Sequence, residues 1–262
     1  MIAKYMFLAD RFDKRAVTWS LRIFGLALVV DVASELFAGV WQVHTGQLYP
    51  WRHLGIIPLY PPSVLVAEWT LRAAAGLTLL FGATRAKVVA PAVRVAAAVL
   101  FVAVLERYSN HGALLFLIAF FLTIAPPAVT APSFDDAPHP ALGLVRAQLV
   151  IVYAFSALNK LAHGFFRGDS LAILMQTSGH SLAPWGGALS WAVILAELAL
   201  PVLLVLRPRA GLAAVVAMHL AFALLLPNVA SFGLAMIAMA ILYINRPCPS
   251  RSRTPQISGS ST

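Results

Sequence analysis

Charged residues and cysteines are scarce in this chain of 262 residues. Only 11% of the residues are charged, and Cys248 is the one cysteine. A single cysteine excludes an internal disulfide and a Cys-x-x-Cys redox pair, so the chain cannot carry out thiol-disulfide chemistry within itself. The first fifteen residues contain no compact apolar centre and no small-residue cleavage site, and we therefore do not expect a signal peptide there.

Apolar residues dominate the composition instead. They make up 60% of the chain, and the mean hydropathy is +0.83, far above that of a soluble domain. The sequence therefore predicts an all-α integral membrane protein, with the lipid bilayer as its main environment. The formal charge of +9 is spread over short clusters between the apolar runs, which is typical of topology signals and not of a nucleic-acid site.

Eight apolar segments can be recognised, each bounded by charges, Pro or Gly, and each close to the roughly 20 residues that a membrane span needs. They indicate a bundle of about eight transmembrane helices. We expect residues 1–16 to form an interfacial segment, residues 17–245 the transmembrane domain, and residues 246–262 a disordered cytoplasmic tail. The predicted spans are residues 17–40, 62–82, 87–105, 111–129, 143–162, 187–206, 210–227 and 229–245.

The basic residues are distributed unevenly between the two sides of such a bundle. With eight spans and a cytoplasmic start, most of them fall in inner segments, and the outer segments carry only Arg52, Arg107 and Arg167, with Lys160 at the edge. This positive-inside pattern predicts that both termini are cytoplasmic. We expect a multi-pass protein of the inner (plasma) membrane.

Several ionisable residues lie inside the predicted spans, where each charge costs about 2.5 to 3.5 kcal/mol on insertion scales. We expect them to face the bundle interior as interhelical polar contacts or as parts of a functional site. Glu68 and Arg72 are four residues apart and can pair within one helix. Asp31 and Glu35 share a helical face, so either one of them is protonated or an arginine such as Arg94 reaches them. The residues concerned are Asp31, Glu35, Glu68, Arg72, Arg94, Glu197 and His219.

The stretch YAFSALNKLAHGFFRGDSL places Lys160 at the end of an apolar helix. Its ammonium could snorkel to the headgroups, or it could lie against protein in a low dielectric, where a lysine can act as a base. Asn110 could be the N-cap of the fourth span, with His111 in its first turn. His219 could bond a neighbouring carbonyl or carry protons in a ligand cavity.

Four stretches together resemble one family. They are LVRAQLVIVYAFSALNKLAHGFFRGDSL, RYSNHGALLFLIAFFLTIAP, VTWSLRIFGLALVVDVASE and VVAMHLAFALL. In their order along the chain they resemble the vitamin K-dependent gamma-glutamyl carboxylase family and its bacterial relatives, the horizontally transferred transmembrane (HTTM) domain proteins. The resemblance covers residues 17 to 245, nearly the whole membrane part.

The resemblance implies a site and a chemistry. Lys160 would be the base that deprotonates a vitamin K hydroquinone, with His111 assisting it, in an outward-facing cavity. We expect Asn110, Asn159 and His219 to bind this reduced quinone or another lipidic molecule. Because the 262 residues hold no large extramembrane domain, a carboxylation step would need a small acceptor substrate.

Two other functions are compatible with the residues. The chain could be a non-enzymatic accessory or scaffold protein that binds a membrane protein or helps a peptide to mature and be exported. It could also be a transporter, although no inverted repeat is visible. No metal is predicted, because His163 and His180 have no third ligand at a suitable spacing.

Overall fold

The computed structural model describes residues 11–41, 60–106, 109–124, 139–177, 179, 181–226 and 229–244. Within these ranges the regular secondary structure is helical, which confirms the all-α class. Most of the predicted interfacial segment, up to residue 10, and the whole predicted tail, residues 246–262, lie outside the described residues. The predictions about them are therefore not tested.

Each of the eight predicted apolar segments corresponds to a helix. The helices are α2 (Lys14–Phe37), α4 (Pro62–Gly82), α5 (Ala86–Glu106), α6 (Asn110–Ile124), α7 (Pro140–Ala162), α9 (Gly186–Leu206), α10 (Pro208–Leu225) and α11 (Ala230–Ile241). A short helix, α8 (Asp169–Thr177), and two 3-10 turns, η2 (Phe165–Arg167) and η3 (Ala183–Trp185), join α7 to α9. The sequence did not predict this connection.

Two of the eight apolar helices are short. Among the described residues, six helices are long and apolar enough to cross a membrane, and α6 and α11 are shorter, at 15 and 12 residues. A 12-residue helix rises about 18 Å, less than the roughly 30 Å of a bilayer core. Helix α11 packs against α2, α10, α6 and α7, so it is enclosed by protein. The structure thus confirms a multi-helix membrane protein, and the count of eight spans and the side of the termini stay predictions.

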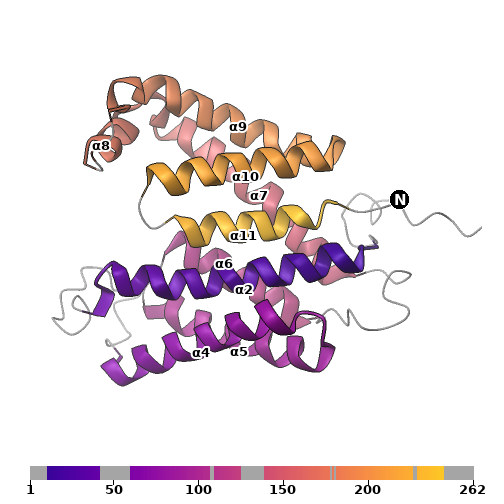
Figure 1. Ribbon diagram of the computed structural model, residues 1–262. Helices are drawn as coiled ribbons and strands as arrows, with labels where there is room; N and C mark the ends of the chain where they lie inside the picture. The colour runs from indigo at the N-terminus through magenta and orange to yellow at the C-terminus, as the bar shows by residue number, and fades with distance from the viewer. Residues whose placement is uncertain are drawn as a thin grey trace, which may run out of the picture.

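The long helices run side by side in an antiparallel bundle (Figure 1). Helices α9 and α10 form one side of the bundle, α4 and α5 form the opposite side, and α2, α6, α7 and α11 lie between them. Helix α2 begins and α11 ends at the same end. At the other end of the bundle, α2 ends, α4 and α6 begin, and α8 is located. We refer to this end of the bundle as the α8 end.

Local hydrogen bonds explain where two of the helices begin. The Asp13 carboxylate accepts hydrogen bonds from the backbone N–H groups of Arg15 and Ala16, so α2 begins at Lys14, three residues before the predicted boundary. At α6 the Ser109 hydroxyl accepts a hydrogen bond from the Gly112 N–H at 3.1 Å. The prediction that Asn110 is the N-cap is therefore wrong, because Ser109 fills that position and Asn110 is the first helical residue.

Glycines bring α2 and α4 into backbone contact. A Cβ atom added to Gly25 would lie 2.5 Å from the Gly76 carbonyl oxygen and 2.8 Å from the Leu80 nitrogen, and one added to Gly76 would lie 2.7 Å from the Gly25 carbonyl oxygen. Small residues at such crossings let helices approach closely in membranes. This crossing fixes the distance between the two helices that carry the buried acids Asp31 and Glu68.

We expect Gly25→Ala to lower the melting temperature of the purified protein, because the new methyl group meets backbone that cannot move aside. Overpacking of this kind costs about 1 to 3 kcal/mol. Gly187→Ala in α9 is the matched control, since a Cβ there meets only one atom, at 3.7 Å. Equal melting temperatures for the two variants would contradict the close crossing.

Candidate functional site

Lys160 lies in the last turn of α7 and its amine points into the protein. The Nζ atom donates to both carboxylate oxygens of Glu197, at 2.7 and 2.8 Å, and to the Ser156 hydroxyl at 2.5 Å. The Ser156 hydroxyl in turn donates to the Glu197 carboxylate at 3.1 Å. The Lys160 side chain is 22% exposed and that of Glu197 only 6%. The snorkelling interpretation is therefore wrong, and we refer to Ser156, Lys160 and Glu197 as the Lys160 cluster.

Sequence reasoning missed Glu197 as the partner of Lys160. It recognised Glu197 as an acid inside a span, but the two residues are 37 positions apart and belong to helices separated by α8. Packing of α7 against α9 brings them together. The one signal in the sequence is that Lys160 and Glu197 have opposite charges and lie in predicted spans, where a charge needs a partner.

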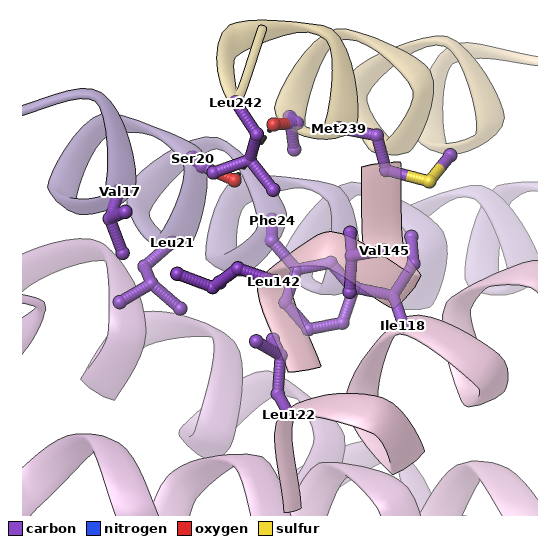
Figure 2. Close-up of a pocket in the computed structure, with 11 residues that line it drawn as sticks. Val17, Ser20, Leu21, Phe24, Ile118, Leu122, Leu142, Val145, Met239 and Leu242 are labelled. Atoms are coloured by element: carbon purple, nitrogen blue, oxygen red, sulfur yellow. Dashed lines mark hydrogen bonds between the residues drawn. The ribbon is translucent and has the colours of Figure 1, made fainter. Parts of the chain in front are cut away.

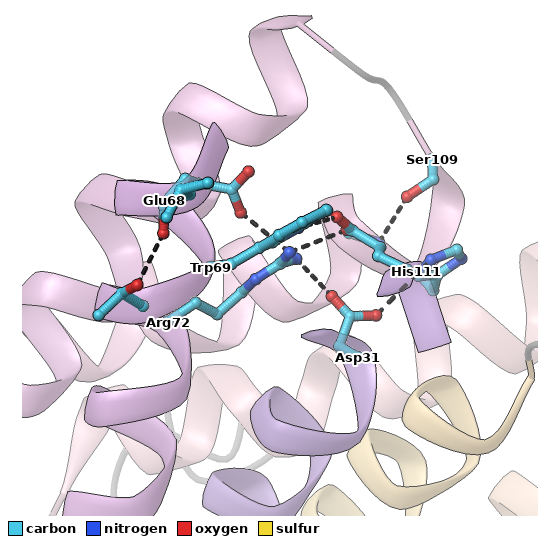
Figure 3. Close-up of polar contacts among 10 residues, drawn as sticks. Asp31, Glu68, Trp69, Arg72, Ser109 and His111 are labelled. Carbon is cyan, nitrogen blue, oxygen red and sulfur yellow. Dashed lines mark hydrogen bonds and ion pairs between the residues drawn. The ribbon is translucent and has the colours of Figure 1, made fainter. Parts of the chain in front are cut away.

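A second group of charges surrounds Arg72 of α4 (Figure 3). Its guanidinium lies 2.6 Å from the Asp31 carboxylate, 2.9 Å from that of Glu35 and 2.9 Å from that of Glu68. The Trp69 indole N–H donates to the other Glu35 oxygen at 2.6 Å. The predicted pairing of Glu68 with Arg72 is confirmed.

The arginine that meets the two acids of α2 is Arg72 and not Arg94. Arg94 is exposed on α5, so the suggestion that it reaches Asp31 and Glu35 is wrong. The physical reason is the glycine crossing, which places α4 directly against α2.

His111, at the start of α6, belongs to this second group. Its Nε2 atom lies 3.7 Å from the free Asp31 oxygen, and its side chain is 36% exposed. We refer to Asp31, Glu35, Glu68, Trp69, Arg72 and His111 as the Arg72 cluster. Lys160 contacts Ser156 and Glu197 of the Lys160 cluster, whereas His111 contacts Asp31 of the Arg72 cluster. The two predicted catalytic residues therefore share no partner among the described residues. The role predicted for each of them stays a prediction.

His219 is buried inside the bundle. It is 3% exposed, its Nε2 atom lies 2.9 Å from the Tyr153 hydroxyl oxygen, and the rings of Phe222 and Phe232 pack edge-on against it. Its hydrogen-bond partner is thus a tyrosine of α7, and not the carbonyl that we considered.

The two predicted asparagines lie beside the predicted catalytic residues and are exposed. Asn110 precedes His111 in the first turn of α6, and Asn159 precedes Lys160 in α7. The Asn159 carbonyl accepts a hydrogen bond from the His163 backbone. Within the described ranges, which exclude His180, no three His, Cys, Asp or Glu side chains are placed to hold a metal ion.

An apolar groove lies between α8, α9 and α10. Its volume of about 210 Å³ is below the roughly 300 to 1,000 Å³ typical of sites that enclose a whole small-molecule ligand. Phe222 in its wall packs on His219, and Ala196 in its wall precedes Glu197 in the chain. The groove therefore suits part of an apolar molecule. Its walls adjoin His219 of the Tyr153–His219 pair and Glu197 of the Lys160–Glu197 pair. It is lined by Leu171, Met175, Leu189, Ala192, Val193, Ala196, Met218, Ala221, Phe222, Leu225 and Leu226.

A second crevice lies between α2, α6, α7 and α11 (Figure 2). Side chains such as Phe24, Ile118 and Met239 converge on it and leave about 10 Å³, which is room for about one water molecule. It is a packing gap and does not suit a ligand.

Comparison with known proteins gives one match. The family model of the HTTM domain matches residues 12–247. No curated protein and no solved structure matches the chain.

The pairing of Lys160 with Glu197 predicts a specific pattern of stabilities. Lys160→Met should lower the melting temperature strongly, because it leaves the Glu197 carboxylate buried without its cation. Removing one partner of a fully buried pair costs about 3 to 5 kcal/mol. We expect a smaller cost here, because Lys160 is partly exposed. The double variant Lys160→Met/Glu197→Gln should recover most of the loss. If the two substitutions are additive, the amine and the carboxylate are not paired.

Proposed function

This chain belongs to the HTTM domain family, a family of membrane proteins related to the vitamin K-dependent carboxylases, and we propose that it binds a reduced quinone or a similar lipidic molecule and removes a proton from its hydroxyl group. Lys160 is the base in this proposal. The lipidic molecule contributes an acidic hydroxyl and an apolar chain.

The observation that supports the proposal most is the inward direction of the Lys160 amine. A lysine that serves only as a membrane anchor extends toward the headgroups, whereas this one is bonded to a buried carboxylate. In a low dielectric an ammonium and a carboxylate can exchange a proton and become a neutral pair. The neutral amine of Lys160 can then accept the proton of a nearby hydroxyl, while Glu197 holds the first proton.

In this proposal Glu197 orients the Lys160 amine, a contact that the resemblance did not imply. Both Glu197 oxygens hold the Lys160 amine, and Ser156 completes its contacts. His111 lies in the Arg72 cluster, where it faces Asp31. We propose that His111 assists from there, by exchanging protons at the α8 end, and that Asn110 and Asn159 contribute polar contacts at the same end.

The apolar groove fits the chain of such a molecule. Its lining carries no charge, and its size suits one segment of an isoprenoid or alkyl chain. It lies on α9 beside Glu197 and on α10 beside His219, so an apolar chain in it would leave the polar headgroup near the α8 end. The Lys160 cluster and the groove are thus compatible with a quinol.

Native mass spectrometry of the purified protein tests the binding step. We expect a bound quinone or lipid, and we expect Ala196→Phe to remove it because the new ring fills the groove. Leu195→Phe is the matched control, since Leu195 is 59% exposed on the outer surface of the same helix. Equal occupancy in the two variants would contradict binding in the groove.

Proton removal is tested by oxygen uptake with added vitamin K hydroquinone, because dissolved oxygen oxidises the deprotonated quinol faster than the neutral one. The double variant Lys160→Met/Glu197→Gln should retain the bound molecule and lose the quinol-dependent uptake, by at least tenfold, because it lacks the proton acceptor. Unchanged uptake in a folded double variant would refute the lysine base.

An accessory function is the second candidate, and one observation favours it. Arg94 is exposed on α5, roughly 12 Å from the start of the helix, although charges inside membranes normally face protein. A partner helix with an acidic residue would satisfy it. This function predicts that a membrane protein copurifies with the chain, that Arg94→Leu releases it, and that the double variant at Lys160 and Glu197 has no effect.

A further inference from the structure

Arg22 of α2 is a charge inside a predicted span that has no acidic partner among the described residues. It lies eight residues after Lys14, where α2 begins, and thus about 12 Å along the helix. Its side chain is partly buried, and its Nε atom is buried without a hydrogen bond to the described part of the chain. Arg72, by contrast, faces three carboxyl groups. Because a guanidinium keeps its charge and has five N–H donors, Arg22 needs an anion that these residues do not supply.

The Arg22 side chain extends toward the beginning of α2. Its guanidinium carbon lies 5.2 Å from the centre of the Trp19 ring, three residues earlier in the helix. Trp19 is 54% exposed. Tryptophan is enriched at the headgroup level of membranes, and an arginine inside a span extends its apolar stem to bring its charge to that level. The guanidinium of Arg22 therefore ends beside the lipid headgroups.

Arg15 adds a second positive charge on the same face of α2. Residues 15, 19 and 22 are separated by four and three positions, a spacing that places them on one side of a helix. The Arg15 side chain is exposed and makes no ion pair with the described residues, although its backbone N–H bonds to Asp13. We refer to Arg15, Trp19 and Arg22 as the α2 stripe. It presents two guanidinium groups with an exposed indole between them.

The end of the bundle where α2 begins, opposite the α8 end, is basic as a whole (Figure 1). Asp13 is the one acidic residue described there, and its carboxylate caps α2. At the headgroup level of a bilayer the abundant anion is the lipid phosphate, whose oxygens fit the planar fork of a guanidinium. An anionic phospholipid thus matches the stripe in charge and in apolar character. The exposed basic residues at this end are Lys14, Arg15, Arg85, Lys87, Arg207 and Arg209.

We propose that the α2 stripe binds the headgroup of an anionic phospholipid. The lipid phosphate accepts hydrogen bonds from Arg22, Arg15 supplies the second positive charge, and the upper part of the acyl chains lies against Trp19. This site lies at the end of the bundle opposite the Lys160 cluster and does not depend on quinol binding.

Native mass spectrometry with added lipids tests this site. The protein in detergent is titrated with phosphatidylglycerol or phosphatidylcholine, which differ in headgroup charge. We expect phosphatidylglycerol to bind more tightly, and Arg22→Leu to weaken its binding about fivefold, because a basic residue beside anionic lipid contributes roughly that factor. Arg209→Leu is the matched control, since it removes the same charge from the same end. Equal affinities for the two lipids, or equal losses in the two variants, would overturn the proposal.

Two further variants keep the test decisive if Arg22→Leu folds poorly. Arg15→Leu changes an exposed side chain and should also weaken phosphatidylglycerol binding. Ala196→Phe fills the apolar groove and should leave it unchanged, which separates this lipid from a quinone in the groove. Release of the lipid by excess inorganic phosphate would indicate a site for the free ion. A copurified membrane protein that Arg22→Leu releases would indicate a protein partner, and either result would contradict a lipid site.

Discussion

A charge in the interior of a membrane bundle is stable only beside a group that compensates it, and this constraint determines where the polar residues of this protein lie. Two clusters satisfy it in different ways. In the Lys160 cluster one cation meets one carboxylate, with a hydroxyl bridging the two. In the Arg72 cluster one guanidinium serves three carboxyl groups. The first arrangement is a one-to-one ion pair, whereas the second is a network of four charged side chains.

The fold places the Lys160 cluster and the Arg72 cluster near the surface of the bundle, because Lys160 and His111 are both partly exposed. Lys160 is near the end of α7, and His111 is at the beginning of α6; the two helices are antiparallel, so both positions face the α8 end (Figure 1). The connection through α8 adds an apolar wall, with Leu171 and Met175, to a groove that α9 and α10 complete. Ionisable side chains and an apolar groove thus lie on the same part of the molecule. This combination is what a membrane protein that handles an acidic lipid would need.

The sequence was sufficient to predict the helices, but it was insufficient to predict which charged side chains pair between different helices. Apolar length and bounding Pro or Gly residues predicted all eight apolar helices, because these signals are local, and Pro62 and Gly82 mark both ends of α4. The pairing of Glu68 with Arg72 was predictable because four residues separate them on one helix. The pairing of Lys160 with Glu197 depends on which helices pack together, and the pairing of Arg72 with Asp31 depends on a glycine crossing. No local pattern encodes either one, and α8 was missed because its nine residues are too short for a span.

The direction of the Lys160 amine is the central claim, and reactivity of the amine from the aqueous phase measures it most directly. The chain has four lysines, and Lys14 and Lys87 are exposed. With a water-soluble amine-reactive reagent and mass spectrometry of the peptides, we predict that Lys160 reacts much more slowly than Lys14 and Lys87, and that Glu197→Gln accelerates it. A Lys160 that reacts as fast as the exposed lysines in the wild-type protein would contradict the buried pair and, with it, the proposed base.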